Sequence, residues 1–259
     1  MKEILDKKGF ICDMDGVIYH GNRLLDGVTE FVNWLLANNK KFVFLTNSPE
    51  KTPHELSMKL ERMGLSVTPD HFYTSAMATA EFLSAQMPGC TAYVIGEAAL
   101  SKALYDHQIY MNDVNPDYVV VGETRTYSFE KIEKAIALVN KGAKLIGTNP
   151  DTIGPTEHGI MPATGSLMAP IEIATGKKAY FVGKPNPLML RHGLRMLGCH
   201  SNEIAFIGDR MDTDIIAGIE SNVDTVLVLT GVTAKEDINL FPYRPKYVLG
   251  GVGDIVSAQ

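Results

Sequence analysis

Residues 9–17 decide how this chain folds, and they read Gly9-Phe10-Ile11-Cys12-Asp13-Met14-Asp15-Gly16-Val17. The apolar run 10–12 predicts a short buried strand that ends at two carboxylates and a glycine. Because residues two apart on a strand share a face, Asp13 and Asp15 can both point into one site at the strand's end. Gly16 allows a tight turn of the backbone there. Two like charges this close are unfavourable unless they share a cation or a proton, although Asp and Gly are also common in ordinary surface turns.

The composition limits the kinds of partner that the protein can have. With 259 residues, of which 45% are hydrophobic, the chain can bury the core of one large domain or of two. A formal net charge of -6 argues against nucleic acid or an anionic membrane as the main partner, but leaves room for a phosphorylated small molecule. The sequence leaves open whether the chain forms a homo-oligomer.

The same sequence indicates where the protein works. Residues 1–8 lack the apolar core of a signal peptide, and no apolar run approaches the length of a membrane span. The three cysteines, Cys12, Cys90 and Cys199, have no metal-ligand spacing and are most simply thiols in a reducing compartment. Cys12 should face away from Asp13 and pack in the core. We therefore expect a cytoplasmic protein.

Apolar strands and amphipathic helices alternate along the first part of the chain. A helix is predicted over residues 27–38, and the continuous apolar run 42–45 is typical of a parallel strand that is covered on both faces. A second helix begins at Pro53 and ends near Gly64, and a short strand (72–74) and another helix (76–86) follow. This order predicts an α/β fold with a doubly wound, mostly parallel sheet.

A second α/β unit interrupts this pattern. After Pro88-Gly89, strands are predicted at 92–95, 118–121 and 144–147, and helices at 98–106 and 128–140, the latter with an apolar face of Phe129, Ile132, Ile136 and Val139. A long polar loop is expected over 148–165, followed by a helix that ends near Gly176. Further strands are predicted at 179–182, 204–207 and 225–229. The predicted division is a core of residues 1–87 and 179–259 with an inserted α/β domain at 88–178.

Four of the predicted strands end in side chains that can do chemistry. They are Asp13 with Asp15, Thr46 with Asn47, Lys184, and Asp209 with Asp214 shortly after it. Each group alone is ordinary: a threonine can cap a helix, a lysine can be a solvated surface amine, and an aspartate can belong to a turn. In open α/β sheets, however, ligands bind beyond the carboxyl ends of the strands. The four groups together therefore favour one shared site.

These strand ends resemble the four ordered motifs of the haloacid dehalogenase (HAD) superfamily. They stand here as Asp13-Met14-Asp15-Gly16-Val17, Leu45-Thr46-Asn47, Gly183-Lys184-Pro185, and Gly208-Asp209-Arg210-Met211-Asp212-Thr213-Asp214. The insert is similar to the large α/β cap (type IIA) of the NagD-like and nitrophenylphosphatase-like branch, with supporting stretches at 73–76 and 148–151. The resemblance implies a Rossmann-like core with a cap domain, and a phosphatase that uses Mg²⁺.

The resemblance also implies a role for each site residue. Asp13 would be the nucleophile that forms an aspartyl-phosphate, and Asp15 would protonate the leaving group and then activate water. Mg²⁺, which suits hard oxygen ligands, would be held by Asp13, the Asp15 backbone carbonyl and Asp209. Lys184 would offset the repulsion between the phosphate and the acidic groups. The remaining expectations are that Asp214 orients metal-bound water or Lys184, and that Thr46 and the Asn47 amide hold phosphate oxygens.

The carboxylate at Asp15 separates the candidate functions. Members of the superfamily that attack carbon, or that keep the phosphoenzyme for transport, lack an acid there. Its presence favours hydrolysis of a phosphate monoester, with a nucleoside monophosphate or a sugar phosphate as the substrate. The alternatives are a receiver-like module that accepts phosphoryl groups without turnover, and a binding protein that has lost catalysis. Specificity is expected in loop 148–165, with Asn149 and Asp151 as candidates, although a solvated linker is a competing interpretation of that loop.

Overall fold

The computed structural model describes residues 2–156 and 159–257, and it divides into two compact units. The core unit consists of Met1–Thr46, Pro53–Tyr73 and Lys184–Gln259. The cap unit consists of Asn47–Thr52 and Thr74–Gly183. The predicted boundaries near residues 88 and 178 differ from this division. The helix α4 (Ser75–Gln86) packs against α5 (Ala98–Asp106), and strand β12 (Tyr180–Phe181) pairs with a strand of the cap, so both belong to the cap unit.

The core unit is built on a six-stranded sheet in the order β15-β14-β13-β1-β4-β5. Its strand β1 pairs in parallel with β4 on one side and with β13 on the other, and the order of the strands along the chain reverses at β1. Such a reversal opens a crevice at the carboxyl ends of the strands, where ligands bind in this class of sheet. The strands are β1 (Gly9–Cys12), β4 (Lys41–Thr46), β5 (Phe72–Thr74), β13 (Ile204–Gly208), β14 (Asp224–Val228) and β15 (Tyr247–Leu249).

Helices cover both faces of the core sheet. On one face, Cys12 is fully buried in a large apolar cluster with side chains of helices α2, α3 and α10, as its expected orientation away from Asp13 requires. On the other face, Gly193 of helix α8 lies against Ile11, and Gly218 of helix α9 lies against Phe206. The helices are α1 (Lys2–Leu5), α2 (Val28–Ala37), α3 (Pro53–Arg62), α8 (Pro187–Leu197), α9 (Ile216–Glu220) and α10 (Gly253–Ser257). A small hairpin, β2 (Tyr19–His20) and β3 (Arg23–Leu24), was not expected from the sequence.

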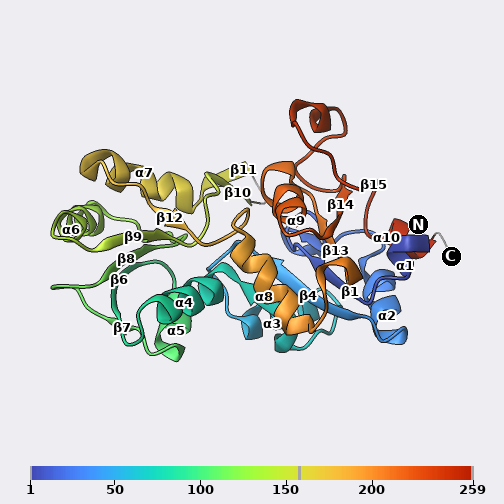
Figure 1. The fold of residues 1–259 in the computed structure, drawn as a ribbon, viewed down its shortest axis with the longest axis horizontal. Coiled ribbons are helices and arrows are strands. Elements are labelled where there is room, and N and C mark those ends of the chain that lie inside the picture. Colours follow the sequence, from blue (N-terminus) through green and yellow to red (C-terminus); the bar gives the residue numbers. More distant parts are fainter. Residues whose placement is uncertain (1, 157–158, 258–259) are drawn as a thin grey trace. The chain divides into compact units, whose positions relative to one another are not determined.

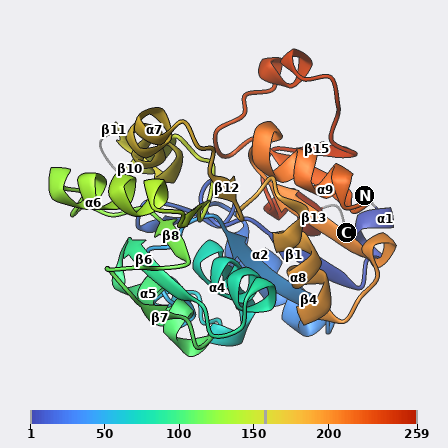
Figure 2. The same cartoon turned by 60° about the vertical axis from the view of Figure 1, so that its left-hand side comes forward.

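The cap unit has its own parallel sheet, in the order β12-β9-β8-β6-β7. Helices α6 (Phe129–Asn140) and α7 (Thr164–Thr175) lie on one face of it, and α4 and α5 lie on the other (Figures 1 and 2). The side chains of Val119, Val121 and Leu145 pack under α6 and α7. The remaining strands are β6 (Thr91–Ile95), β7 (Tyr110–Met111), β8 (Tyr118–Val121) and β9 (Lys144–Gly147).

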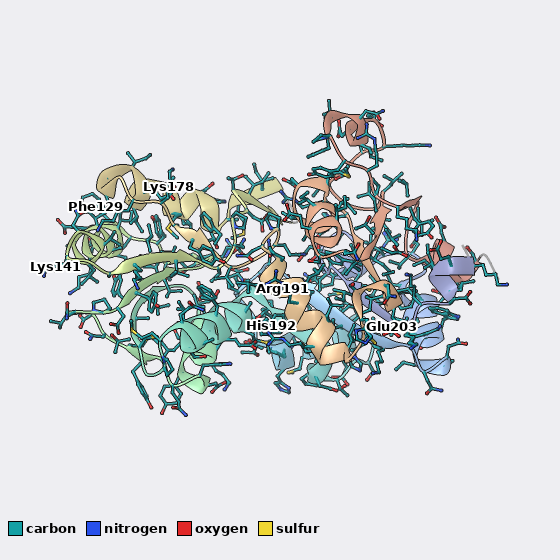
Figure 3. The ribbon with its side chains drawn as sticks, in the orientation of Figure 1. Phe129, Lys141, Lys178, Arg191, His192 and Glu203 are labelled. Atoms are coloured by element: carbon teal, nitrogen blue, oxygen red, sulfur yellow. The ribbon has the colours of Figure 1, made fainter. Side chains whose placement is uncertain are left out.

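Two details of the cap differ from the prediction. Part of the expected loop 148–165 is an antiparallel hairpin of β10 (Ile153–Thr156) and β11 (Gly159–Pro162). Its isoleucines, Ile153 and Ile160, are exposed. Because none of the hairpin side chains that the structure describes is buried, the sequence has no continuous apolar run or apolar–polar alternation that would predict these strands. Phe129 does not belong to the buried face of its helix: it is 75% exposed, in the first turn directly after the capping Ser128 (Figure 3). Among the described residues, no helix combines the length and the apolar character needed to cross a membrane.

Candidate active site

Lys184 contacts two of the other predicted strand-end groups and the backbone of a third strand. Its Nζ atom lies 2.6 Å from Asp13 Oδ1 and 2.8 Å from Asp214 Oδ1, and it donates a hydrogen bond of 3.3 Å to the carbonyl oxygen of Leu45. The lysine is only 2% exposed. A buried ammonium is stable only when carboxylates and hydrogen bonds replace its water, and here the ends of β1 and β4 and the turn after β13 supply them.

The turn after β13 explains how Asp214 reaches this position. The chain leaves β13 at Gly208 and forms a π-helical turn, Met211–Ile215, which brings Asp214 back beneath the strand end. Its Oδ2 atom accepts hydrogen bonds from the amides of Asp209 (3.2 Å) and Arg210 (3.1 Å). A Cβ atom at Gly208 would lie 2.2 Å from that of Asp214, so only glycine fits. The Oδ1 atom of Asp214 has no hydrogen-bond partner among the described residues, but the ion pair of 2.8 Å with Lys184 occupies it, so both oxygens of Asp214 face groups of the protein.

Asp209 has a carboxylate oxygen that can still bind a ligand. Its Oδ2 atom accepts a hydrogen bond of 2.7 Å from the Val232 amide, whereas its Oδ1 atom is buried and has no hydrogen-bond partner among the described residues. Asp13, Asp209 and Asp214 each offer an oxygen atom, and these three atoms lie within 4.8 Å of one another. An unpartnered, buried carboxylate oxygen beside a second carboxylate fits a hard divalent cation such as Mg²⁺. Asp13 and Asp209 are the residues best placed to hold it.

The loop after β14 is a part of the site that sequence reasoning missed. It folds over Asp209: a Cβ atom at Gly231 would lie 2.0 Å from Asp209 Oδ2, and one at Gly16, whose φ is 79°, would lie 2.5 Å from it. The hydroxyl of Thr230 donates a hydrogen bond of 2.7 Å to the Gly16 carbonyl, which ties this loop to the turn after β1. The sequence signal that could have identified this loop is the pair Thr230-Gly231, which directly follows the strand predicted at 225–229 and so lies at the same edge of the sheet as the other site residues.

The electrostatics of the site favour an additional positive charge. Burial raises the pKa of Asp13 well above its ordinary value, and the repulsion from Asp214 and Asp209 adds to this effect, although Lys184 opposes it. Burial, with Asp214, also raises the pKa of Asp209 to about 7. Burial disfavours the ammonium of Lys184, but Asp13 and Asp214 outweigh this cost and raise the pKa of the lysine, which stays charged. One ammonium thus faces three carboxylates.

Asp15 lies in a different setting, in the turn that follows β1. Its Oδ2 atom accepts a hydrogen bond of 3.3 Å from the hydroxyl of Tyr19, and the Nζ atom of Lys59 lies 3.6 Å from the centre of the Tyr19 ring. Burial raises the pKa of Asp15, while Lys59 and Tyr19 lower it by less. A carboxyl group with a raised pKa is suited to donate a proton and to take it back.

The predicted pair Thr46-Asn47 is divided between the two units. Thr46 is buried at the end of β4 in the core, two residues beyond Phe44, which pairs with Cys12. Asn47 groups with the cap, where its Nδ2 atom donates a hydrogen bond of 2.8 Å to Asp151 Oδ2 and its carbonyl accepts one from the Ser75 hydroxyl. The Asn47 side chain is therefore oriented by the cap.

Asn149, one of the two candidate specificity residues, is an internal support of the cap. It is fully buried, and its Oδ1 atom accepts hydrogen bonds from the hydroxyls of Thr148 (2.8 Å) and Thr164 (2.7 Å). Its Nδ2 atom donates to Asp151 (2.9 Å) and Glu123 (3.3 Å). With both donors and both lone pairs engaged, the Asn149 side chain has no hydrogen-bonding capacity left for a ligand.

A crevice at the strand-order reversal of a parallel sheet, with acids and one lysine at the strand ends, matches a known class of enzyme. The family profile described as haloacid dehalogenase-like hydrolase matches residues 10–110, and the one described as HAD-hydrolase-like matches residues 181–255. The chain belongs to the HAD-like hydrolases. The resemblance inferred from the four motifs is thereby confirmed, as is the α/β fold class.

Comparison with individual proteins narrows the class. The chain is 46% identical to a dihydroxyacetone phosphatase of Corynebacterium glutamicum over 96% of this chain and 90% of that protein. It is 43% identical to the ribonucleotide monophosphatase NagD of Escherichia coli K12, over 96% and 98%. A crystal structure of 4-nitrophenylphosphatase from Thermotoga maritima superposes with a TM-score of 0.94 at 35% identity and 98% coverage of both chains. The protein is a NagD-like HAD phosphatase.

Proposed function

We propose that the protein is a Mg²⁺-dependent phosphomonoesterase that works through an aspartyl-phosphate on Asp13. The observation that carries the proposal is the buried Lys184 ammonium between the Asp13 and Asp214 carboxylates, together with the buried Oδ1 atom of Asp209, which has no hydrogen-bond partner in the described part of the chain. A phosphate dianion that approaches Asp13 is repelled by every carboxylate in the site. Each such pair costs roughly 4 kcal/mol at 4 Å and an effective dielectric constant near 20. The Lys184 charge offsets part of this cost.

The proposed reaction has two steps. In the first, a carboxylate oxygen of Asp13 attacks phosphorus, the ester P–O bond breaks, and the leaving oxygen takes a proton from the carboxyl group of Asp15. In the second, the Asp15 carboxylate takes a proton from water, the water oxygen attacks phosphorus, and the bond to Asp13 breaks to release orthophosphate. Each proton transfer contributes typically about 10²–10⁴-fold to the rate. Tyr19 and Lys59 hold the Asp15 carboxyl group in place.

The other site residues bind rather than react. Mg²⁺, held by Asp13, the Asp15 backbone carbonyl and Asp209, would act as a Lewis acid on the phosphate oxygens. Asp214 keeps Lys184 in position through the contact of 2.8 Å. The Thr46 hydroxyl and the Asn47 amide bind the remaining phosphate oxygens.

The substrate that we propose is a small phosphorylated metabolite, either a nucleoside monophosphate or a sugar phosphate. The relatives are named dihydroxyacetone phosphatase, ribonucleotide monophosphatase and, in Staphylococcus saprophyticus at 37% identity, acid sugar phosphatase. What these substrate classes share is a phosphate monoester on a small polar leaving group. The cap then selects the leaving group and excludes water.

The test is phosphate release from a panel of nucleoside monophosphates and sugar phosphates, with Mg²⁺ and with EDTA. The proposal predicts continuous turnover that requires Mg²⁺, that is lost in Asp13→Asn, and that persists in Asp26→Asn, a matched change at a fully exposed aspartate. Acid-quenched protein should carry acid-stable phosphate on residue 13 when it is trapped during turnover. A single stoichiometric phosphorylation without turnover would instead establish the receiver-like alternative, and activity that survives in Asp13→Asn would overturn the proposed nucleophile.

A further inference from the structure

The cap unit contains a cavity that none of the proposed catalytic residues lines. It has a volume of about 540 Å³, within the range of roughly 300–1,000 Å³ that small-molecule sites occupy. It lies at the amino ends of β9 and β12, bordered by the carboxyl end of α4. All the residues that line it lie between positions 82 and 180, within the cap unit.

The alternation of side chains along the cap strands explains the cavity. Leu145 points under α6 and α7, so its neighbours Lys144 and Ile146 point to the opposite face, as does Tyr118, the register partner of Lys144. Helix α4 ends at Gln86 and leaves this corner of the face partly uncovered. The floor of the cavity is therefore a sheet surface made of aromatic, aliphatic and basic side chains.

One wall of the cavity is aromatic. The rings of Phe82 on α4 and Tyr180 on β12 are stacked, with their centroids 5.1 Å apart and their planes 24° from parallel. Met87 also lines the cavity, and a thioether packs favourably against an aromatic ring. A flat ring that enters the cavity would find a rigid apolar surface at low entropic cost.

The charge of the cavity has one sign. Lys144, Lys177 and Lys178 line it, and among the residues that the structure describes no Asp or Glu side chain does so. Lys177 donates to the carbonyl of Val139, and Lys178 lies 3.2 Å from Glu172. Lys144 lies over the Tyr118 ring at 5.8 Å and, among residues 2–156 and 159–257, has no carboxylate within ion-pairing distance. Its ammonium can therefore bind an anion without breaking an existing pair.

We propose that this cavity binds a small planar aromatic anion, with its ring against Phe82, Tyr180 and Met87 and its acidic group at Lys144 and Lys178. Within the cap unit, the cavity is separate from the proposed phosphate-binding residue Asn47: Asn47 bonds to Asp151, which follows the carboxyl end of β9, whereas Lys144 lies at the amino end of that strand. Thr148, the first residue beyond β9, is about 13 Å along the strand from Lys144 at roughly 3.3 Å per residue. Binding should therefore persist when phosphate occupies the active site.

The experiment uses naphthalene-2-sulfonate, a planar aromatic anion with no phosphate ester to hydrolyse, and measures its binding by isothermal titration calorimetry. Naphthalene-2-methanol, which lacks the charge, and inorganic sulfate, which lacks the ring, should each bind much more weakly. The affinity should fall about tenfold in Lys144→Ala, the loss expected when one charged contact is removed. It should fall by less in Lys178→Ala, because Lys178 is already paired with Glu172.

The matched control is Lys141→Ala, which removes an exposed lysine of the same unit that does not line the cavity (Figure 3). This variant should bind the probe with nearly the wild-type affinity. An equal loss in Lys141→Ala would mean that the probe senses only the general positive field and would overturn the site. Wild-type affinity in Lys144→Ala, or displacement of the probe by saturating orthophosphate with Mg²⁺, would overturn it as well. Unchanged thermal unfolding and phosphatase activity in the lysine variants would show that they fold normally.

Discussion

Replacement of the Asp13 nucleophile by asparagine should abolish turnover and yet stabilise the metal-free protein. Asp13 lies within 4.8 Å of carboxylate oxygens of Asp209 and Asp214 and 2.6 Å from the Lys184 ammonium. At an effective dielectric constant near 20, each repulsion amounts to about 3 kcal/mol and the attraction to about 6 kcal/mol, so the two kinds of interaction nearly cancel. What remains is the free-energy cost of burying the charge of Asp13, and the uncharged side chain of asparagine does not have this cost.

We therefore expect Asp13→Asn to unfold at a higher temperature than the wild type in EDTA at pH 7.5. The expected gain is about 1–3 kcal/mol, or about 3–8 °C for a chain of this size. The single tryptophan, Trp34, lies on α2 with its ring 5.7 Å from that of Phe10, so its fluorescence reports unfolding of the core unit. Asp26→Asn, at an exposed aspartate, is the control and should leave the transition unchanged.

The dependence of this gain on pH and on metal gives two further checks. The folded-state pKa values of Asp13 and Asp209 are raised, the latter to about 7. The contribution of these two groups to the stability of the metal-free wild type is therefore largest below the ordinary aspartate pKa and is lost as the pH rises to and through 7, and Asp13→Asn should show a smaller loss over this range. Mg²⁺ should stabilise the wild type more than the variant. A variant that is less stable than the wild type in EDTA, or equally stabilised by Mg²⁺, would refute the account of a site with too much negative charge.

Three other substitutions test separate parts of the structure. Asp15→Asn should lower kcat by about 10²–10⁴-fold with unchanged affinity for orthophosphate, and a near-normal kcat would remove Asp15 as the acid. Asp151→Ala takes the acceptor from the Asn47 amide and should raise KM about tenfold, whereas Asp151→Asn should recover most of this loss; a normal KM in the alanine variant would contradict the link. Asp224→Asn should destabilise the protein in urea by about 1–2 kcal/mol at pH 7. Burial raises the pKa of Asp224, but its two lysine partners outweigh this and lower it, so the difference should shrink below about pH 4, and a difference that persists there would disprove the pairing.

The buried parallel strands were predictable because their apolar runs are continuous. Ile204–Gly208, for example, is buried at every position. The hairpin of β10 and β11 could not be predicted in the same way, since neither Ile153 nor Ile160 is buried and the stretch is rich in Gly and Pro.

The positions of the charged groups were only partly predictable. The motifs and the topology brought Asp13, Lys184 and Asp209 to one edge of the sheet, and the contacts of Lys184 with Asp13 and Asp214 agree with that expectation. The return of Asp214 through a π-helical turn depends on i→i+5 backbone bonding, which leaves no periodic signal in five residues. The loop that covers Asp209 depends on the space left by Gly16 and Gly231, which is visible only in three dimensions.

The pairing of β1 with β13 sets the order in which the protein can form while it is being synthesised. The cap sheet can close from the contiguous residues 74–183. In the core, Lys8, directly before β1, bonds to Glu203, directly before β13, a partner 195 positions later, so β1 has one open edge until that segment leaves the ribosome. At about 5–20 residues per second this wait is roughly 10–40 s. The nascent chain must therefore keep a hydrophobic strand from aggregating while the inserted domain is already folded.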